Sequence, residues 1–219
     1  MMGAARPLAT IDHLVLAATS LADGIDYVAS LTGAVAHPGG KHVAMGTHNA
    51  LVKLGDKLFL EIIAIDPTAS KPARPRWFGL DGVALQAELM ESPRLIHWVA
   101  RTHDLVAAVA ASAVDLGRIH PMSRGDYRWR ITIPDDGALP GRGLIPTLIQ
   151  WDVPQHPANA LPDQGLSLVE LAGTHRDPGS IRNPLHVLGL EDSLRVAFDR
   201  ETRLAAMLRT PRGLVTLAS

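Results

Sequence analysis

Histidine and carboxylate side chains occur inside segments of the chain that are otherwise apolar. His13 lies in TIDHLVLA, His97 lies in LIHWVA, and Glu61 lies in KLFLEIIAI. Burying such a group without a partner is costly, so each one must be hydrogen-bonded, ion-paired or bound to a metal. Imidazoles and carboxylates bind divalent transition metals, and both transfer protons. These three residues are therefore the first candidates for a functional site.

An internal repeat relates two of these residues. Residues 11–33 and 95–117 align without a gap, and His97 lies 84 residues after His13. A third copy, residues 167–190, follows the second at a spacing of 72. The third copy has valine at the position of the histidines, so the paired histidines are not a simple result of repetition.

Each copy predicts the element order βαβββ. An apolar strand comes first, and a polar residue then starts a helix that ends at a glycine suited to a left-handed C-cap. The helix starts are Ser20, Asp104 and Asp177, and the glycines are Gly33, Gly117 and Gly189. Three strand-like runs follow each helix. These runs cover about residues 34–38, 48–55 and 57–65, then 119–123, 126–134 and 144–152, then 194–199, 203–211 and 213–219.

The repeats predict an α+β protein built of three units. The first covers residues 8–90 with its connecting segment, the second covers 93–158, and the third covers 165–219. Stretches rich in proline and glycine separate the units. We expect the third unit to pack across its own pair of units or across a two-fold interface, which leaves a homodimer open.

Composition excludes several classes of function. The 219 residues carry a net charge of −1, so there is no basic surplus to bind nucleic acid. The chain contains no cysteine, which excludes disulfides and thiolate metal sites. It has neither an apolar run of about 18 residues for a membrane span nor the apolar core of a signal peptide. We expect a cytoplasmic protein whose partner is a small molecule.

Tandem units with histidine on the first strand and glutamate on the last strand resemble the vicinal oxygen chelate (VOC) superfamily. That group includes glyoxalase I, extradiol dioxygenases, fosfomycin-resistance thiol transferases and metal-free bleomycin-resistance proteins. The segments DHLVLAATSL, MGTHNALVKLGDKLFLEIIA, RWFGLD and PTLIQWD are similar to its glyoxalase-like branch. The resemblance implies curled mixed sheets around a cleft, and it leaves the reaction open because this fold carries several chemistries.

Four positions on paired units hold the metal in the metal-binding members of this superfamily. Side chains alternate along a strand, and His13 and Glu61 would both face the cleft from the first unit. His97 and Gln150 occupy the matching positions of the second unit. The resemblance implies that these four residues bind divalent Fe, Mn, Ni, Co or Zn, with open positions for a substrate. Gln150 departs from the usual second carboxylate, and an amide that hydrogen-bonds Glu61 or a ligand is the alternative.

Further residues are candidates around the cleft. The resemblance indicates Asn49 as an amide that positions substrate, and His48 begins the same strand. Trp98 is a candidate cleft wall that contacts substrate. Glu61 and His156 are candidate acid–base groups, and a position in a surface loop is the alternative for His156.

Two classes of function remain. In the first, the chain is a metal-dependent enzyme of lyase, isomerase or dioxygenase type that acts on a small oxygenated molecule. In the second, it is a metal-free protein that binds and sequesters a small molecule. His13, Glu61 and His97 would then form a hydrogen-bonded cluster in an apolar cleft. The paired histidines favour the enzyme, because a binding protein does not require them.

Overall fold

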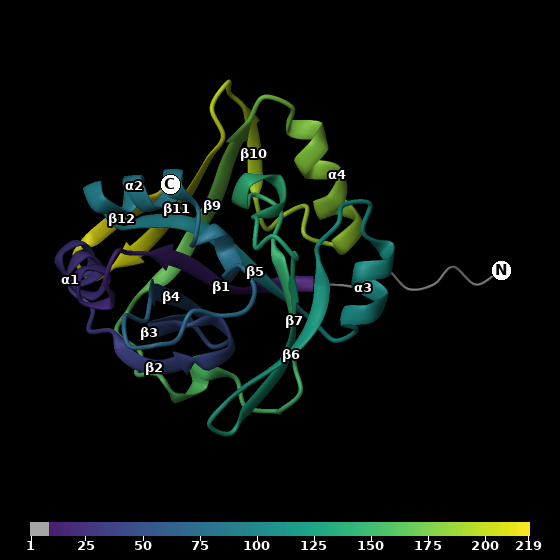
Figure 1. Cartoon of the computed structure of the whole chain (residues 1–219). Coiled ribbons are helices and arrows are strands. Elements are labelled where there is room, and N and C mark those ends of the chain that lie inside the picture. Colours follow the sequence, from purple (N-terminus) through teal and green to yellow (C-terminus); the bar gives the residue numbers. More distant parts are fainter. Residues whose placement is uncertain (1–8) are drawn as a thin grey trace.

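Three βαβββ units follow one another in the structure, a computed structural model that describes residues 9–219 (Figure 1). The first contains β1 (Ala9–Ala17), α1 (Leu21–Thr32), β2 (His37–His42), β3 (Thr47–Gly55) and β4 (Leu58–Ile65). The second contains β5 (Arg94–Thr102), α3 (Leu105–Ala111), β6 (Arg118–Arg124), β7 (Tyr127–Ile133) and β8 (Thr147–Trp151). The third contains β9 (Ser167–His175), α4 (Pro178–Leu188), β10 (Arg195–Phe198), β11 (Arg203–Thr210) and β12 (Gly213–Ala218). The predicted α+β fold of tandem βαβββ modules is confirmed.

Some element bounds differ from the sequence prediction. β2 begins at His37 rather than near residue 34, because its pairing with β3 begins there. A helix that was not predicted, α2 (Val83–Glu91), lies in the connection between the first two units. Residue 8, the predicted start of the first unit, lies outside the described residues. Short 3₁₀ turns cover Val43–Met45, Trp77–Gly79, Pro140–Gly143 and Pro157–Ala160. No helix in residues 9–219 is long and apolar enough to cross a membrane.

The helix ends follow the predicted capping residues with one exception. Side chains accept a hydrogen bond from a backbone N–H in the first helical turn at Ser20, Asp104 and Asp177. Gly33 and Gly189 are left-handed C-caps, as predicted. α3 instead ends at Ala111, so Gly117 is not its C-cap. Gly117 serves close packing, because a Cβ at this position would lie 2.2 Å from the backbone carbon of Ile133.

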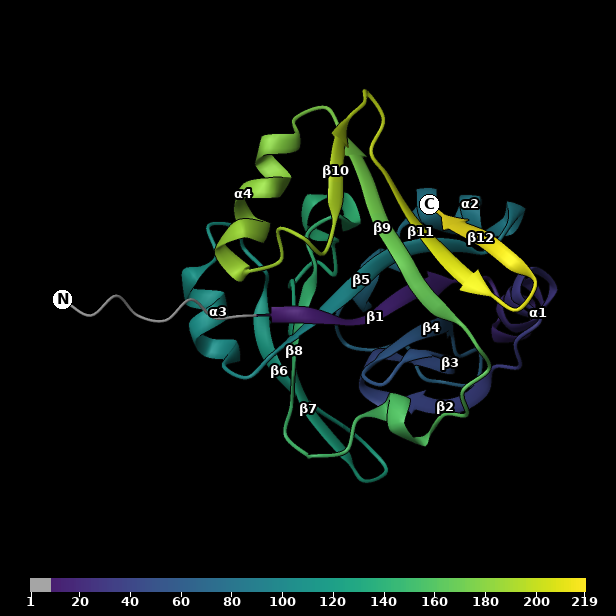
Figure 2. The same ribbon diagram turned by 180° about the vertical axis from the view of Figure 1, so that it is seen from behind.

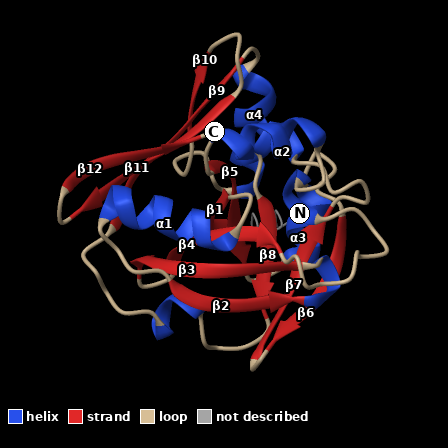
Figure 3. Ribbon diagram, turned by 60° about the vertical axis from the view of Figure 1, so that its left-hand side comes forward, coloured by secondary structure: helices blue, strands red, loops and turns tan. Residues whose placement is uncertain are grey.

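The first two units form one curled sheet of eight strands in the order β2-β3-β4-β1-β5-β8-β7-β6. β1 and β5 are adjacent and antiparallel, which joins the two units edge to edge. In each of these two units the first strand pairs in parallel with the last. Figure 3 shows the curl of this sheet, with α1 and α3 outside it. Successive side chains on each strand therefore alternate between a concave and a convex face.

Two apolar clusters occupy the two faces of the large sheet. Leu14 and Trp98 belong to the cluster on the convex face. Val15, Ile63 and Trp129 belong to the cluster on the concave face. The concave cluster surrounds the polar residues described below, so the candidate site is built into one of the two cores.

The third unit packs on the convex face of the large sheet of the same chain. Its four strands form a separate sheet in the order β10-β9-β11-β12. Figure 2 shows β9 and β11 crossing over β1 and β5. Leu171, Leu204 and Leu208 are buried in the convex cluster together with residues of the first two units. The third unit therefore packs across its own pair of units, one of the two arrangements expected from the sequence.

Candidate functional site

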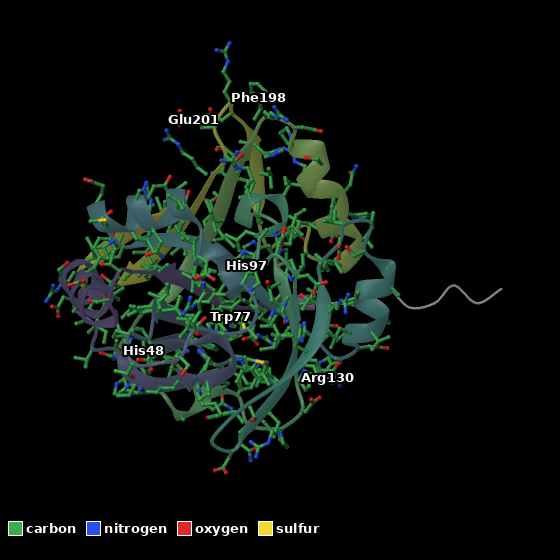
Figure 4. All side chains as sticks on the ribbon, viewed as in Figure 1. His48, Trp77, His97, Arg130, Phe198 and Glu201 are labelled. Carbon is green, nitrogen blue, oxygen red and sulfur yellow. The ribbon has the colours of Figure 1, made fainter. Side chains whose placement is uncertain are left out.

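A narrow pocket opens on the concave face of the large sheet. Both of the first two units contribute aromatic rings and a few polar side chains to it. Its lining residues are His13, His42, Asn49, Phe59, Glu61, Trp77, Phe78, Arg124, Trp129, Ile131, Ile149, Trp151 and Pro157. Figure 4 shows Trp77 near the middle of the molecule. Pockets with apolar walls and a few converging polar groups are the usual sites for small molecules.

His13 is held in place by the residue before it. Nδ1 of His13 donates a hydrogen bond to Oδ1 of Asp12 at 2.7 Å. Consecutive strand residues normally face apart, but the β1–β5 register shifts between Ile11 and His13. Because a carboxylate only accepts, Nδ1 of His13 carries a proton, and in the neutral form of the ring Nε2 is then the acceptor. Nε2 of His13 lies 3.7 Å from Oε2 of Glu61, which also lines the pocket.

Asp12 is fully buried and holds three side chains. Its Oδ2 accepts hydrogen bonds from Nε1 of Trp151 at 2.9 Å and from Nε2 of His156 at 3.0 Å. Burial by itself would raise the pKa of Asp12, but the hydrogen bonds from His13 and His156 outweigh it and hold that pKa well below its usual range. Asp12 is therefore ionised at neutral pH and fixes the orientation of both histidine rings.

His156 lies behind Asp12 and does not line the pocket. Its Nδ1 accepts a hydrogen bond from the backbone N–H of Ala158 at 3.2 Å, and its Nε2 donates to Asp12. The residue is 4% exposed, which is incompatible with the surface-loop alternative. Since both ring nitrogens already have partners, His156 supports Asp12 in this structure.

Glu61 is held from the opposite side by an amide. Nδ2 of Asn49 donates to Oε1 of Glu61 at 2.5 Å, and Oδ1 of Asn49 accepts from Nη1 of Arg124 at 3.0 Å. Gly39 makes room for this contact, because a Cβ there would lie 2.1 Å from Oδ1 of Asn49. Within residues 9–219, Oε2 of Glu61 makes no hydrogen bond. One oxygen of Glu61 is therefore fixed and the other remains available in the pocket.

His42 adds a neutral polar group to the pocket wall. Its Nδ1 lies 3.2 Å from Oγ1 of Thr47, and its Nε2 lies 3.5 Å from Nη1 of Arg124. An arginine only donates, so Nε2 of His42 is the acceptor and the ring is neutral. Burial, with the positive charge of Arg124 as the next cause, lowers the pKa of His42 to about 3.

Aromatic rings form the remaining walls. Phe59 stacks on the His13 ring with the centroids 4.6 Å apart, and Trp77 stacks on Phe78 at 5.2 Å. Trp77 is 4% exposed, and its Nε1 has no hydrogen-bond partner among the described residues. The walls therefore keep water away from His13 and Glu61 and leave one buried donor unused.

His97 is part of the structural core. It is 0% exposed and does not line the pocket. Its Nδ1 lies 3.1 Å from the carbonyl oxygen of Gly143, and its Nε2 accepts a hydrogen bond from the backbone N–H of Thr147 at 3.0 Å. Burial lowers the pKa of His97 to about 3, against the opposing effect of the Gly143 carbonyl. Neither ring nitrogen is free to bind a metal.

Three other predicted site residues lie away from the pocket. Gln150 faces the convex side of β8, where its Oε1 accepts from the backbone N–H of Leu105 at the start of α3. Trp98 is buried in the convex cluster and donates to the carbonyl oxygen of Leu144. His48 does not line the pocket either, and Figure 4 shows it well to one side of Trp77 and His97.

The residues present do not fit the predicted metal site. His13 and Glu61 meet in the pocket, but His97 and Gln150 are engaged elsewhere. In the part of the chain that the structure describes, no group of three or more His, Cys, Asp or Glu side chains is arranged to hold a metal ion. The face assigned to β8 from the sequence is reversed, because Ile149 and Trp151 fill the concave side.

Sequence reasoning missed three features of the site: Asp12, Arg124 and the free donor of Trp77. An acidic residue directly before His13 was a signal for Asp12, but regular strand alternation places the two on opposite faces. Arg124 ends β6, and no local pattern links it to Glu61, which is 63 residues earlier. These contacts depend on how the two units curl around the pocket.

Comparison with known proteins places the chain in a family. The model of the glyoxalase-like domain family matches residues 11–189. The chain belongs to this glyoxalase-like family of the VOC superfamily. No curated protein matches the chain significantly.

Solved structures with a similar fold come from several bacteria. A hypothetical protein from Staphylococcus aureus is 14% identical, with a TM-score of 0.58 over 89% of this chain and 88% of that one. The methylmalonyl-CoA epimerase of Streptomyces coelicolor is 19% identical, with a TM-score of 0.42 over 68% of this chain and 99% of the other. The epimerase of Mycobacterium tuberculosis is 18% identical, with a TM-score of 0.41 over 68% and 92%. At such low identity, the likeness to the first of these structures concerns the fold alone.

Proposed function

We propose that this glyoxalase-like protein is an enzyme of isomerase or lyase type in which His13 and Glu61 transfer a proton at a carbon next to a carbonyl group. The observation that carries the proposal is the arrangement of His13. Oδ1 of Asp12 accepts a hydrogen bond from Nδ1 of His13 at 2.7 Å, and Nε2 of His13 lies 3.7 Å from Oε2 of Glu61. An imidazole oriented by a buried carboxylate is well suited to act as a general base.

The chain's own groups can carry out each step. The aromatic walls hold a flat or apolar substrate and exclude water. Nε2 of His13 accepts the proton from carbon, and the electron pair of the broken C–H bond moves onto the carbonyl oxygen of the substrate as an enolate. The resulting imidazolium is stabilised by Asp12 and by the nearby Glu61. The proton then returns to an adjacent carbon or oxygen of the substrate. Glu61, fixed by Asn49, is the second group able to deliver it.

The metal-dependent reactions expected from the sequence need His97 and Gln150 as ligands. Both side chains are bound within the protein, so we propose chemistry that uses the acid–base groups of the pocket. The alternative function, sequestration of a small molecule, is favoured by the aromatic walls. It is distinguished from catalysis by whether a bound compound exchanges protons.

Proton exchange in deuterium oxide tests the proposed function. Proton NMR would follow deuterium uptake next to the carbonyl in a panel of 2-oxo acids, 1,2-dicarbonyls and 2-hydroxy ketones. We expect the wild type to accelerate exchange in at least one compound class, and His13→Gln and Glu61→Gln each to lower the rate about 100-fold or more. His103→Gln is the control, because His103 is exposed and lies outside the pocket.

The outcomes separate the alternatives. A compound that binds without exchange in the wild type would favour sequestration. Exchange at the wild-type rate in both His13→Gln and Glu61→Gln would remove these residues from the mechanism. We expect a chelator such as EDTA to leave the rate unchanged. A rate lost on chelation and restored by a divalent transition metal would contradict the metal-independent scheme.

A further inference from the structure

Arg124 places a positive charge at the pocket that the proton-transfer scheme does not use. Its side chain is half-buried and lines the same pocket as His13 and Glu61. Burial lowers the pKa of its guanidinium and the nearby Glu61 carboxylate opposes that effect, but an arginine remains charged at any physiological pH. A partly buried charge of this kind is stabilised when a directly bonded anion is present.

The hydrogen bonds of Arg124 leave one edge of its guanidinium unoccupied. Nη1 donates to Oδ1 of Asn49 at 3.0 Å and lies 3.5 Å from Nε2 of His42. Asn49 stands between Arg124 and Glu61, so these two opposite charges do not pair directly. Nε and Nη2 make no hydrogen bond with residues 9–219. Together these two atoms form an edge that binds a carboxylate through two parallel hydrogen bonds.

The position of Arg124 suits a residue that receives a ligand from solvent. Besides the narrow pocket, Arg124 also borders an open groove, together with Tyr127 and Asp126. The guanidinium lies 5.9 Å from the centre of the Tyr127 ring, which limits its movement. A ligand bound to Arg124 by one end can therefore extend from the groove toward His13.

A second unused donor belongs to Trp77, which lines the same pocket. Nε1 of Trp77 is buried without a partner, and an unsatisfied buried N–H costs free energy that a ligand oxygen can recover. The His42 ring links the two donors, since it lies 4.9 Å from the Trp77 ring and 3.5 Å from Nη1 of Arg124. Two unused donors among the residues that line an aromatic pocket indicate a ligand with several oxygen acceptors and a flat body.

We propose that the substrate is a small oxo carboxylic acid. The Nε–Nη2 edge of Arg124 binds its carboxylate, and Nε1 of Trp77 donates to an oxygen of the same molecule. The carboxylate is inferred from these contacts alone, whereas the oxo group rests on the proposed function. Arg124 and Trp77 thus select the substrate, and His13 and Glu61 act on it.

Binding measurements with matched probes test the proposal without requiring catalysis. Isothermal titration calorimetry would compare benzoate with benzamide, which has the same flat body without the charge, and would include phenylpyruvate as an oxo acid. We expect benzoate to bind at least tenfold more tightly than benzamide. Arg124→Gln should remove this preference by weakening benzoate alone, and Trp77→Phe, which keeps the aromatic wall, should weaken benzoate severalfold.

Two further variants keep the test specific. Arg124→Lys retains the charge without the two-donor edge, so we expect an affinity for benzoate between those of the wild type and Arg124→Gln. Arg130→Gln is the matched control, because Arg130 pairs with Asp152 outside the pocket (Figure 4). It should bind both probes like the wild type. Near-UV circular dichroism would confirm that each variant keeps its aromatic packing.

Several results would overturn the proposal. They are equal affinity for benzoate and benzamide, no binding of benzoate or phenylpyruvate at millimolar concentration, or a preference for benzoate that persists in Arg124→Gln. If Arg124 serves only to neutralise Glu61, Arg124→Gln will weaken both probes equally and Arg124→Lys will restore them fully. Failure of the proposed function gives a different result, in which phenylpyruvate binds through Arg124 but its C3 protons do not exchange faster than in buffer.

Discussion

Asp12 connects more of the site than any catalytic candidate, since His13, Trp151 and His156 all donate hydrogen bonds to it. Replacing it by asparagine keeps its size but introduces an amide donor facing groups that are themselves donors. We therefore expect Asp12→Asn to disturb the orientation of His13 and lower proton exchange about 100- to 10,000-fold. The same NMR assay checks this rate.

The stability of Asp12→Asn gives a second readout. Leaving buried donors unpaired should lower the free energy of unfolding by about 1–3 kcal/mol, measured by urea denaturation. Asp152→Asn is the control, because that carboxylate is exposed and, within residues 9–219, forms its ion pair with Arg130 at the surface. This variant should lower the free energy of unfolding by less than about 1 kcal/mol and leave the rate of proton exchange unchanged. A fully active Asp12→Asn variant would show that His13 does not depend on Asp12.

Buried neutral histidines predict that the protein loses stability in mild acid. The pKa of His97 and that of His42 are both about 3, with burial as the first cause, whereas an unfolded histidine titrates near pH 6.5. Between these values the unfolded chain binds protons that the folded chain does not. The stabilisation is thus complete above pH 6.5 and is lost progressively as the pH falls toward 3.

Urea denaturation between pH 7.5 and 5 measures this effect. Below about pH 6.5 we expect the free energy of unfolding to fall by about 1.4 kcal/mol per pH unit for each histidine. His97→Gln should be less stable at pH 7.5, since Gly143 and Thr147 lose well-placed partners. Below about pH 6.5 its free energy of unfolding should fall less steeply with pH, by about 1.4 kcal/mol per pH unit, because one titrating histidine is absent. An unchanged slope in His97→Gln would mean that His97 is protonated in the folded state.

His13 and Glu61 could be placed from the sequence, whereas His97 could not. The repeat and strand alternation were enough to bring His13 and Glu61 to one pocket. They were not enough for His97, because equivalent backbone positions do not determine which groups form hydrogen bonds with the ring. The segment between Gly143 and Thr147 occupies both ring nitrogens, and a repeat of 84 residues carries no information about that segment.

At the scale of elements, the β2–β3 hairpin positions the acid–base pair. A Cβ on Gly39 would lie 2.1 Å from Oδ1 of Asn49, so Gly39→Ala must move the amide that holds Glu61. We expect proton exchange to fall about tenfold or more, because small displacements of reacting groups are costly. The free energy of unfolding should fall by about 1–3 kcal/mol.

Gly55→Ala in β3 is the control for this substitution. The nearest atom to a Cβ there is Cβ of Leu58 at 3.6 Å, which is an ordinary contact. This variant should exchange protons at the wild-type rate. The same rate in Gly39→Ala would show that Asn49 does not position Glu61.

Elements were predicted well where apolar periodicity was strong and poorly where irregular backbone intervened. β4 and β11 match their predicted runs within one residue at each end. α3 ends early because the chain turns after Ser112, whose hydroxyl donates to the carbonyl oxygen of Val114. The register shift beside His13 in β1 is likewise a property of strand pairing, and it is the feature that brings Asp12 to the site.

At the scale of the whole molecule, one apolar cluster joins all three units. Leu14 of the first unit, Leu148 of the second and Leu208 of the third are each 0% exposed within it. Three units could be counted from the sequence, but the face that the third unit covers could not be chosen, because either sheet face of a unit carries apolar residues. A shared core implies that the units unfold together.

This cooperativity can be tested because all four tryptophans lie in the first two units, at positions 77, 98, 129 and 151. Leu208→Ala removes buried apolar volume from β11 and should lower the free energy of unfolding by about 2–5 kcal/mol. If the core is shared, the urea midpoint followed by tryptophan fluorescence will shift as far as the midpoint followed by far-UV circular dichroism. Leu214→Ala in β12 is the control, because Leu214 is 60% exposed and its loss should shift neither signal. A shift in circular dichroism with an unchanged fluorescence midpoint would mean that the third unit unfolds alone and that the pocket does not depend on it for stability.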